Sequence, residues 1–170
     1  MNVMKNIRIE KITLNVGAGN DQAVLEKGLK LIKHITGVNP VKTFTNKRIP
    51  TWGLRPGLPI GCKLTLRGAA AEELFGRMLK ARNNKLNNNH FDHHGNVSFG
   101  IHEYIDIPLV KYLPELGLMG LQVCATLERP GYRVKKRKLL QRKIPGKHII
   151  KPQESIEFMK QKYGISIEED

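Results

Sequence analysis

The stretch from Val41 to Gly68 carries side chains suited to binding a charged partner. Between two candidate strands it has cations, a single tryptophan and no acid; the residues singled out are Lys47, Arg48, Trp52, Arg55 and Gly57. Prolines in the same stretch restrict φ, so we expect a stiff loop rather than a mobile one. A stiff basic loop with an exposed aromatic ring suits a phosphate-rich partner. The alternative is a solvated hairpin tip without a binding role.

A second basic segment runs from Arg129 to Lys151 and holds ten Lys or Arg residues and no acid. Gly131, Pro145 and Gly146 interrupt it, so we do not expect one long helix. A block of like charges repels itself when isolated and becomes ordered on a polyanion. The alternative is a solvated tail. The cations expected to bind are Arg129, Arg133, Lys135, Lys136, Arg137, Lys138, Arg142 and Lys143.

The overall charge favours a polyanionic partner. The chain has 170 residues, a formal net charge of +14 and a pI near 10.0. Nucleic acid is the first candidate and an anionic membrane surface the second. No apolar run is long enough to span a membrane, and the first residues do not resemble a signal peptide. Cys62 and Cys124 have no CxxC partner, which indicates two buried thiols in a reducing compartment, the cytoplasm.

Two short motifs resemble a cofactor site and a metal site, but each lacks part of the required pattern. Gly17-Ala18-Gly19 resembles part of a dinucleotide-binding turn, but position 22 is Gln and the third glycine is missing. The segment 90–96 holds three histidines and an aspartate, but without the helical spacing or nearby cysteine of common metal sites. No nucleophile–base pair or paired-carboxylate motif is present. We therefore expect no metal, no cofactor and no enzymatic activity.

Hydrophobic periodicity predicts an α+β fold of two layers, with helices on one face of a mainly antiparallel sheet. Strands are predicted at 7–16, 41–45, 63–67, 97–107 and 121–127, and helices at 22–36, 69–82 and from Pro152 to Gly164. Residues 83–89 are predicted to form a loop, and the acidic residues 168–170 to fray. The expected organisation is one RNA-binding domain, 1–128, with a long loop at 45–62, followed by a basic C-terminal extension, 129–170.

The same pattern predicts the bounds and buried sides of these elements. The apolar phase of the first strand shifts near Glu10, so we expect a bulge or a strand start there. Asn20 or Asp21 is expected to cap the first helix, and Gly37 to end it. The expected buried stripes are Val24, Gly28, Leu31, Ile32 and Ile35 in the first helix and Ala71, Leu74, Phe75, Met78 and Leu79 in the second.

The strand alternation also predicts a polar, partly cationic sheet face that no helix covers. Its residues are Lys11, Thr13, Asn15, Lys63, Thr65, Arg67, Gln122 and Thr126. Because these side chains are not aromatic, we expect contacts to the backbone and ribose of folded RNA rather than stacking on single strands.

Four segments resemble a known family: residues 11–19 (KITLNVGAG), 35–40 (ITGVNP), 57–68 (GLPIGCKLTLRG) and 91–101 (FDHHGNVSFGI). They are similar to the universal large-subunit ribosomal protein that binds 5S rRNA, the fifth protein in that subunit's numbering. The segment from Arg129 resembles the archaeal and eukaryotic branch, and the short N-terminal region indicates an archaeal chain. The family commonly has Gly-Arg-Gly-Asn where this chain has His93-His94-Gly95-Asn96.

The resemblance implies a structural, non-catalytic ribosomal protein that anchors 5S rRNA in the central protuberance of the large subunit. It implies that Asn15, Lys42, Thr43, Lys63, Thr65 and Arg67 contact 5S rRNA, in addition to the Lys11 and Thr13 indicated by the strand pattern. The 45–62 loop is expected to contact tRNA in the P site. Further expected partners are large-subunit rRNA and neighbouring ribosomal proteins, including a small-subunit protein at an intersubunit bridge. The alternative is a basic adaptor that binds polyanions without preference for 5S rRNA.

Overall fold

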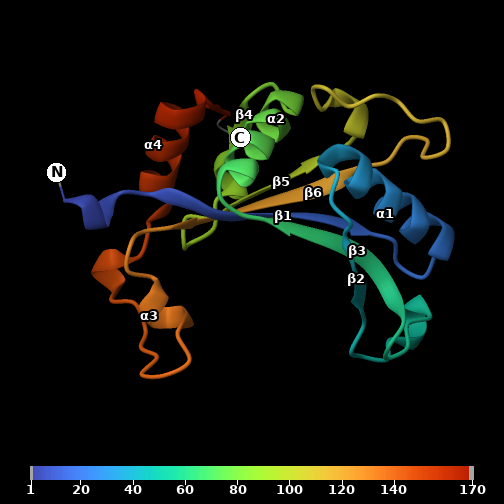
Figure 1. Ribbon diagram of the computed structural model, residues 1–170, viewed down its shortest axis with the longest axis horizontal. Coiled ribbons are helices and arrows are strands. Elements are labelled where there is room, and N and C mark those ends of the chain that lie inside the picture. Colours follow the sequence, from blue (N-terminus) through green and yellow to red (C-terminus); the bar gives the residue numbers. More distant parts are fainter. Residues whose placement is uncertain (1, 169–170) are drawn as a thin grey trace.

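The longest strand, β1 (Arg8–Gly17), lies at the centre of a five-stranded sheet. The computed structural model describes residues 2–168, and the sheet order is β2-β3-β1-β6-β5 with every neighbouring pair antiparallel. The other strands are β2 (Val41–Phe44), β3 (Pro59–Leu66), β5 (Val97–Ile101) and β6 (Leu121–Glu128). Figure 1 shows the helices α1 and α2 on one side of this sheet. The predicted α+β class is confirmed.

The alternation of β1 explains how the sheet acquires one buried face. Ile12, Leu14 and Val16 are each less than 5% exposed, and they point toward the helices. The pairing of β1 with β6 shifts register between Ile9 and Lys11. This irregularity lets Ile9 join the core although its number has the opposite parity, as the sequence predicted.

Helix α1 (Gln22–Thr36) begins and ends where the sequence predicted. The carboxylate of Asp21 accepts hydrogen bonds from the amides of Ala23 at 2.8 Å and Val24 at 3.4 Å, and Gly37 ends the helix with φ of 72°. The buried stripe differs from the prediction at one position. Leu25 is buried and Val24 only partly, because the helix is rotated so that Leu25 faces the sheet.

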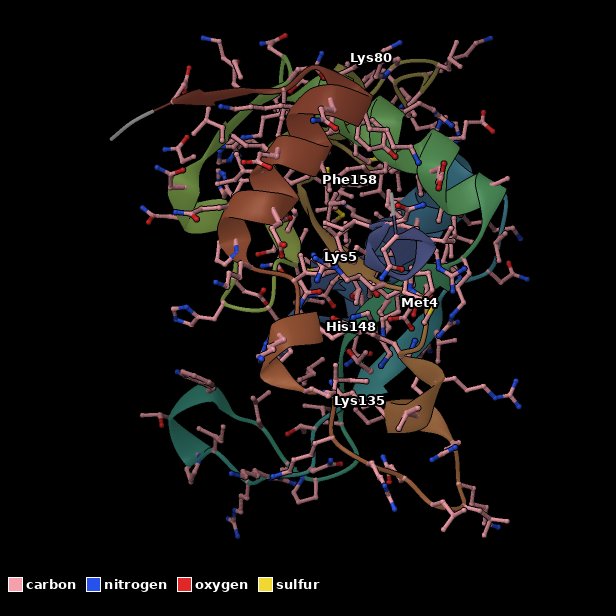
Figure 2. The ribbon with its side chains drawn as sticks, turned by 90° about the vertical axis from the view of Figure 1, so that its left-hand side faces the viewer. Met4, Lys5, Lys80, Lys135, His148 and Phe158 are labelled. Atoms are coloured by element: carbon pink, nitrogen blue, oxygen red, sulfur yellow. The ribbon has the colours of Figure 1, made fainter. Side chains whose placement is uncertain are left out.

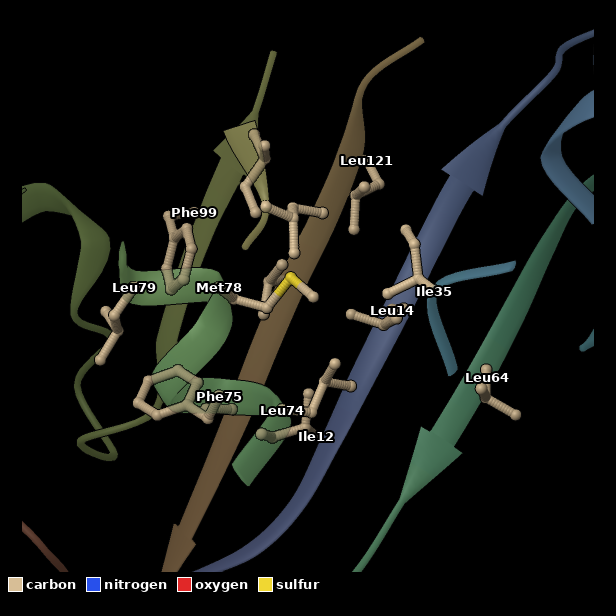
Figure 3. Close-up of a cluster of buried hydrophobic side chains, with 14 of the residues drawn as sticks. Ile12, Leu14, Ile35, Leu64, Leu74, Phe75, Met78, Leu79, Phe99 and Leu121 are labelled. Carbon is tan, nitrogen blue, oxygen red and sulfur yellow. The ribbon is translucent and has the colours of Figure 1, made fainter. Parts of the chain in front are cut away.

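Helix α2 (Ala69–Ala81) contributes the other half of the core. Its predicted stripe is confirmed in full, and its members are Ala71, Leu74, Phe75, Met78 and Leu79. Figure 3 shows Leu74, Phe75 and Met78 beside apolar side chains of the sheet. Burial of large apolar side chains of this kind stabilises a fold by roughly 1.5–3 kcal/mol each.

Two predicted strands have the wrong bounds. Strand β3 begins at Pro59 rather than residue 63, which shortens the predicted 45–62 loop. Strand β5 ends at Ile101 rather than residue 107, and Tyr104–Asp106 forms a 3₁₀ turn. The turn buries Tyr104 completely, and its hydroxyl accepts a hydrogen bond from the amide of Leu113 at 3.0 Å. Residues 97–107 alternate locally like a strand, and this contact with a later segment overrides the pattern.

The chain's last described residues fold back onto α2. Helix α4 (Pro152–Tyr163) leads to β7 (Ser166–Glu168), which pairs in parallel with β4 (Lys85–Asn87). The prediction of a loop at 83–89 is therefore wrong for Lys85–Asn87, and Glu168 is not frayed. A three-residue strand whose partner lies far away in the chain leaves no periodic signal in its own sequence. Residues 169 and 170, also predicted to fray, lie outside the described residues.

The C-terminal segment shares the core of the first 128 residues. Ile150, Met159 and Ile165 are at most 5% exposed and belong to the same apolar cluster. The ring of Tyr163 packs edge-on against Phe75 with centroids 5.2 Å apart. The segment is thus built into the fold. Within residues 2–168, no helix has the length and apolar character needed to cross a membrane.

Candidate nucleic-acid interface

Two rows of polar side chains cross the sheet face opposite α1 and α2, which we call the open face. In one row Thr13 lies between Thr65 and Cys124, and Ser98 follows on β5. This row presents hydroxyl groups, which can donate to or accept from ribose and phosphate oxygens.

The second row carries one cation, Lys63. Asn15 lies between Lys63 and Gln122, and its Nδ2 donates to Oε1 of Gln122 at 2.9 Å. Lys11 pairs with Thr126 at the end of the sheet nearer to the C-terminal extension, and Arg67 follows directly after β3. The structure thus brings the predicted open-face residues together on one face of the sheet, and Cys124 and Ser98, which were not in the predicted set, join them.

The edge strand β2 divides two of the predicted rRNA-binding residues between faces. Thr43 pairs with Gly61 and lies on the open face. Lys42 pairs with Cys62, which is completely buried under α1, so Lys42 lies on the helix side of the sheet. The structure therefore separates Lys42 from the other residues predicted to bind 5S rRNA.

Cys62 and Cys124 differ in environment, so the prediction of two buried thiols is wrong for one of them. Cys62 is buried against α1, and burial raises the pKa of its thiol to about 11. Cys124 is exposed on the open face, because it lies one residue out of phase with the buried residues of β6.

The connection between β2 and β3 is a folded hairpin extension rather than an open loop. The amide of Thr45 donates to the carbonyl of Leu58 at 3.0 Å, and that of Gly57 to the carbonyl of Thr45 at 2.9 Å. A bridge joins Ile49 to Leu54 around a 3₁₀ turn, Pro50–Trp52. The ring of Trp52 is 69% exposed at this turn. The predicted stiffness therefore comes from hydrogen bonds as well as from prolines.

Figures 1 and 2 show that the β2–β3 connection and the basic extension project to the same side of the sheet, away from α1 and α2. The extension contains a short helix, α3 (Arg133–Lys136), and a 3₁₀ turn, Gly146–His148. The two projections flank the open face.

The basic extension is attached to the fold by ion pairs that the sequence did not reveal. Nζ of Lys136 lies 2.6 Å from Glu10 and 2.9 Å from Glu128, and Arg8 lies 2.7 Å from the same Glu128. Burial alone would raise the pKa of Glu128, but hydrogen bonds from Lys136 and Arg8 outweigh it and hold the pKa below its ordinary value. Lys136 is therefore engaged within the protein.

Arg129 is likewise an internal residue. Its side chain is only 5% exposed and lies 2.8 Å from Glu154, at the first turn of α4. A backbone hydrogen bond from Lys151 and the pairing with Arg129 together lower the pKa of Glu154 and outweigh the opposing effect of burial. Six of the eight cations predicted to bind are exposed and form no ion pair within residues 2–168: Arg133, Lys135, Arg137, Lys138, Arg142 and Lys143.

The two minor motifs of the sequence are used structurally. The amides of Ala18 and Gly19 both donate to the carbonyl of Ile60, at 2.9 and 3.1 Å, so these two donors are taken. The carboxylate of Asp92 accepts from the amides of His94 and Asn96 and organises a turn. No group of three or more His, Cys, Asp or Glu residues within residues 2–168 could hold a metal ion.

Comparison with known proteins gives one consistent result. The model of the C-terminal region of the ribosomal L5 family matches residues 59–145, and that of ribosomal protein L5 matches residues 2–55. "Large ribosomal subunit protein uL5" of Sulfolobus acidocaldarius is 44% identical over 98% of this chain and 93% of its own length. Proteins of the same name from Nanoarchaeum equitans and Methanosphaera stadtmanae are 45% and 40% identical, and each match covers at least 96% of both chains.

Proposed function

Because the chain belongs to the ribosomal protein L5 family and is of the archaeal type, we propose that it is a structural component of the large ribosomal subunit that binds 5S rRNA. In this role it anchors 5S rRNA in the central protuberance and works in the cytoplasm. Relatives of this name are structural proteins, so no catalysis is assigned.

The observation that best supports 5S rRNA binding is that the two central rows of the open face contain no acid. Its central rows combine Lys63, Asn15 and Gln122 with Thr13, Thr65 and Ser98. Hydroxyl, amide and ammonium groups on a gently twisted sheet suit the ribose 2′-hydroxyls and phosphates of folded RNA. The absence of aromatic rings from these rows argues against stacking on unpaired bases as the main contact there.

The β2–β3 connection is proposed to contact tRNA in the P site. Lys47, Arg48 and Arg55 supply positive charge, and Trp52 supplies an exposed ring on a turn held by hydrogen bonds. Gly57 has φ of 82°, a conformation that favours glycine and that keeps the base of the connection tight. The extension is proposed to contact large-subunit rRNA, and neighbouring ribosomal proteins, including one of the small subunit, complete the set of partners.

The test of 5S rRNA binding is a filter-binding titration of the full chain at a stated, near-physiological salt concentration. We expect tight binding of 5S rRNA that excess tRNA does not displace. Equal binding of both RNAs, lost in parallel as salt increases, would instead support the basic adaptor without 5S preference.

The tRNA contact is tested separately by the exchange Trp52→Ala in the full chain. The exchange is expected to leave 5S rRNA affinity unchanged and to weaken P-site tRNA binding on reconstituted ribosomes. The matched control is Phe44→Ala, an exposed aromatic residue on β2 outside the turn. Loss of 5S rRNA affinity in Trp52→Ala would mean that the connection had been assigned to the wrong RNA.

A further inference from the structure

A cavity of about 880 Å³ lies where the basic extension meets the sheet. Lys11 and Thr126 form its side on the sheet, and Tyr132, Lys135, Arg142 and Lys143 form the opposite side. Lys11 and the extension are far apart in the sequence, so only the fold brings these two sides together. Lys11 and Thr126 also belong to the open face, so the cavity is continuous with the surface proposed to bind 5S rRNA.

The cavity is fixed in shape by contacts inside the protein. Lys136 joins the short helix α3 to Glu10 and Glu128, one on each of the two adjacent strands. The amide of Arg142 donates to the carbonyl of Val134 at 3.2 Å, which folds the following segment back over α3. These contacts already hold the cavity walls in place in the free protein. A ligand would therefore not have to order the walls, and binding would avoid that entropic cost.

The lining combines positive charge at the edge with apolar surface inside. None of Lys11, Lys135, Arg142 and Lys143 forms an ion pair with any residue in the described part of the chain. The one acid in the lining, Glu10, is already paired with Lys136. Ile144 and Ile149 add partly buried apolar surface. This arrangement fits a ligand that is anionic at one end and planar or apolar at the other.

We propose that this cavity is a second RNA subsite that takes an unpaired nucleotide of the 5S rRNA bound on the open face. The phosphate lies against Arg142 and Lys143, and the base enters toward Ile144 and Ile149. The inference rests on the proposed function and extends it, because it assigns one nucleotide of the bound RNA to the cavity beside the open face.

Two features favour RNA over an acidic peptide as the occupant. The lining pair Lys11–Thr126 lies next to the Thr13–Cys124 pair of the acid-free rows, so an RNA strand on the open face can continue from those rows into the cavity. Lys136 neutralises the one acid of the lining, Glu10. Its volume also exceeds that of a single side chain and lies within the range typical of small-molecule sites. An acidic peptide is an alternative outcome of the test below.

The test compares two double variants of the full chain that lose the same charge. Arg142→Ala with Lys143→Ala removes cations of the cavity lining, and Arg133→Ala with Lys138→Ala removes exposed cations of the same extension that do not line it. Each is titrated against 5S rRNA over a range of salt concentrations. The cavity variant should lose at least about tenfold in affinity, and its salt slope should fall by about 0.7, the value for one single-strand phosphate contact. The control should change by less than about threefold.

A second measurement locates the RNA. A photoreactive label on Gln141→Cys, in a background with Cys124→Ser, should cross-link to an unpaired nucleotide of 5S rRNA. Equal effects of the two double variants, or no cross-link, would overturn the subsite. The subsite would also be wrong if an acidic peptide prevented the cross-link and the cavity double variant bound 5S rRNA with unchanged affinity.

The same titrations distinguish a failure of the subsite from a failure of the proposed 5S rRNA binding. Lys63→Ala with Arg67→Ala on the open face serves as the reference variant. If it weakens 5S rRNA binding and the cavity variant does not, the subsite is wrong and 5S rRNA binding stands. If the unmodified chain does not prefer 5S rRNA over tRNA, the proposed function itself is wrong.

Discussion

Replacing Lys136 with methionine should loosen the basic extension from the sheet. The methionine keeps most of the aliphatic stem and removes the charge that bridges Glu10 at 2.6 Å and Glu128 at 2.9 Å. Among the described residues, Glu128 then keeps one ion-pair partner, Arg8, whose side chain is 61% exposed and is therefore a weaker partner. The closest matched control is Lys138→Met, which removes an exposed charge that forms no ion pair within the described residues.

The size of the effect follows from how far these groups are buried. The side chain of Glu128 is 10% exposed and that of Glu10 is 15%, whereas Lys136 is 46% exposed. Removing one partner of a fully buried pair costs roughly 3–5 kcal/mol, and an exposed pair contributes about 0–1 kcal/mol. For this half-exposed bridge we expect about 1–2 kcal/mol, between those two limits. In a chain of this size that loss lowers Tm by about 2–8 °C.

The effect should depend on pH in a defined direction. The pKa of Glu128 is lowered in the folded state, so the carboxylate contributes stability above its unfolded value of 4.5 and loses that contribution as pH falls through the folded pKa. Burial would lower the pKa of Lys136, but its hydrogen bonds to Glu10 and Glu128 outweigh burial and raise that pKa. The stability that charged Lys136 contributes is therefore present throughout the neutral pH range. The difference between Lys136→Met and the unmodified chain should therefore shrink as pH falls below 4.5.

The assays are thermal unfolding at pH 7 and pH 3, and hydrogen exchange of the α3 amides at pH 7. The amide of Arg137 donates to the carbonyl of Arg133 at 2.9 Å and reports directly on this helix. Lys136→Met should speed its exchange, and Lys138→Met should not. Identical behaviour of the two variants, or a cost independent of pH, would refute the role given to the bridge.

Three further changes test other parts of the fold and the interface. Ser155→Ala should cost about 1–3 kcal/mol in thermal unfolding, because its buried hydroxyl donates to a backbone carbonyl before β5 at 2.7 Å; no change would mean that the carbonyl finds another donor. Gly61→Ala should cost roughly 1–3 kcal/mol, since a Cβ would lie 2.6 Å from a β1 carbonyl oxygen; Gly146→Ala, with no atom within 4 Å, should be neutral. Lys63→Ala with Arg67→Ala should lower the salt slope of 5S rRNA binding by up to about 1.8, at about 0.9 per duplex phosphate, and an unchanged slope would exclude both from the RNA contact.

Elements with a strong local signal were predictable from the sequence. Helix α2 shows all five expected buried residues, and α1 is bounded by Asp21, one of the two expected caps, and by the expected terminator, Gly37. The alternation of β1 identified the polar rows of the open face, because a strand with one buried face fixes what the other face presents. These are short-range patterns, and each is carried by residues a few positions apart.

Features that depend on long-range pairing were not predictable. The parallel pair β4–β7 joins two three-residue segments far apart in the chain, too short for a periodic pattern. Arg129 and Lys136 resemble the other cations of their segment, and only the fold shows that Glu154, Glu10 and Glu128 neutralise them. The same is true of the cavity, whose two sides are distant in sequence.

Whether the open face binds 5S rRNA is tested most directly by alkylation of Cys124 in the full chain. This thiol is exposed between Thr13 and Ser98, while Cys62 is completely buried and serves as an unreactive internal reference. A maleimide is applied at pH 8 to the free protein, with saturating 5S rRNA, and with the same concentration of tRNA. The account predicts that 5S rRNA strongly slows modification of Cys124 and that tRNA does not. An unchanged rate with saturating 5S rRNA would contradict it, because the RNA would then be bound elsewhere.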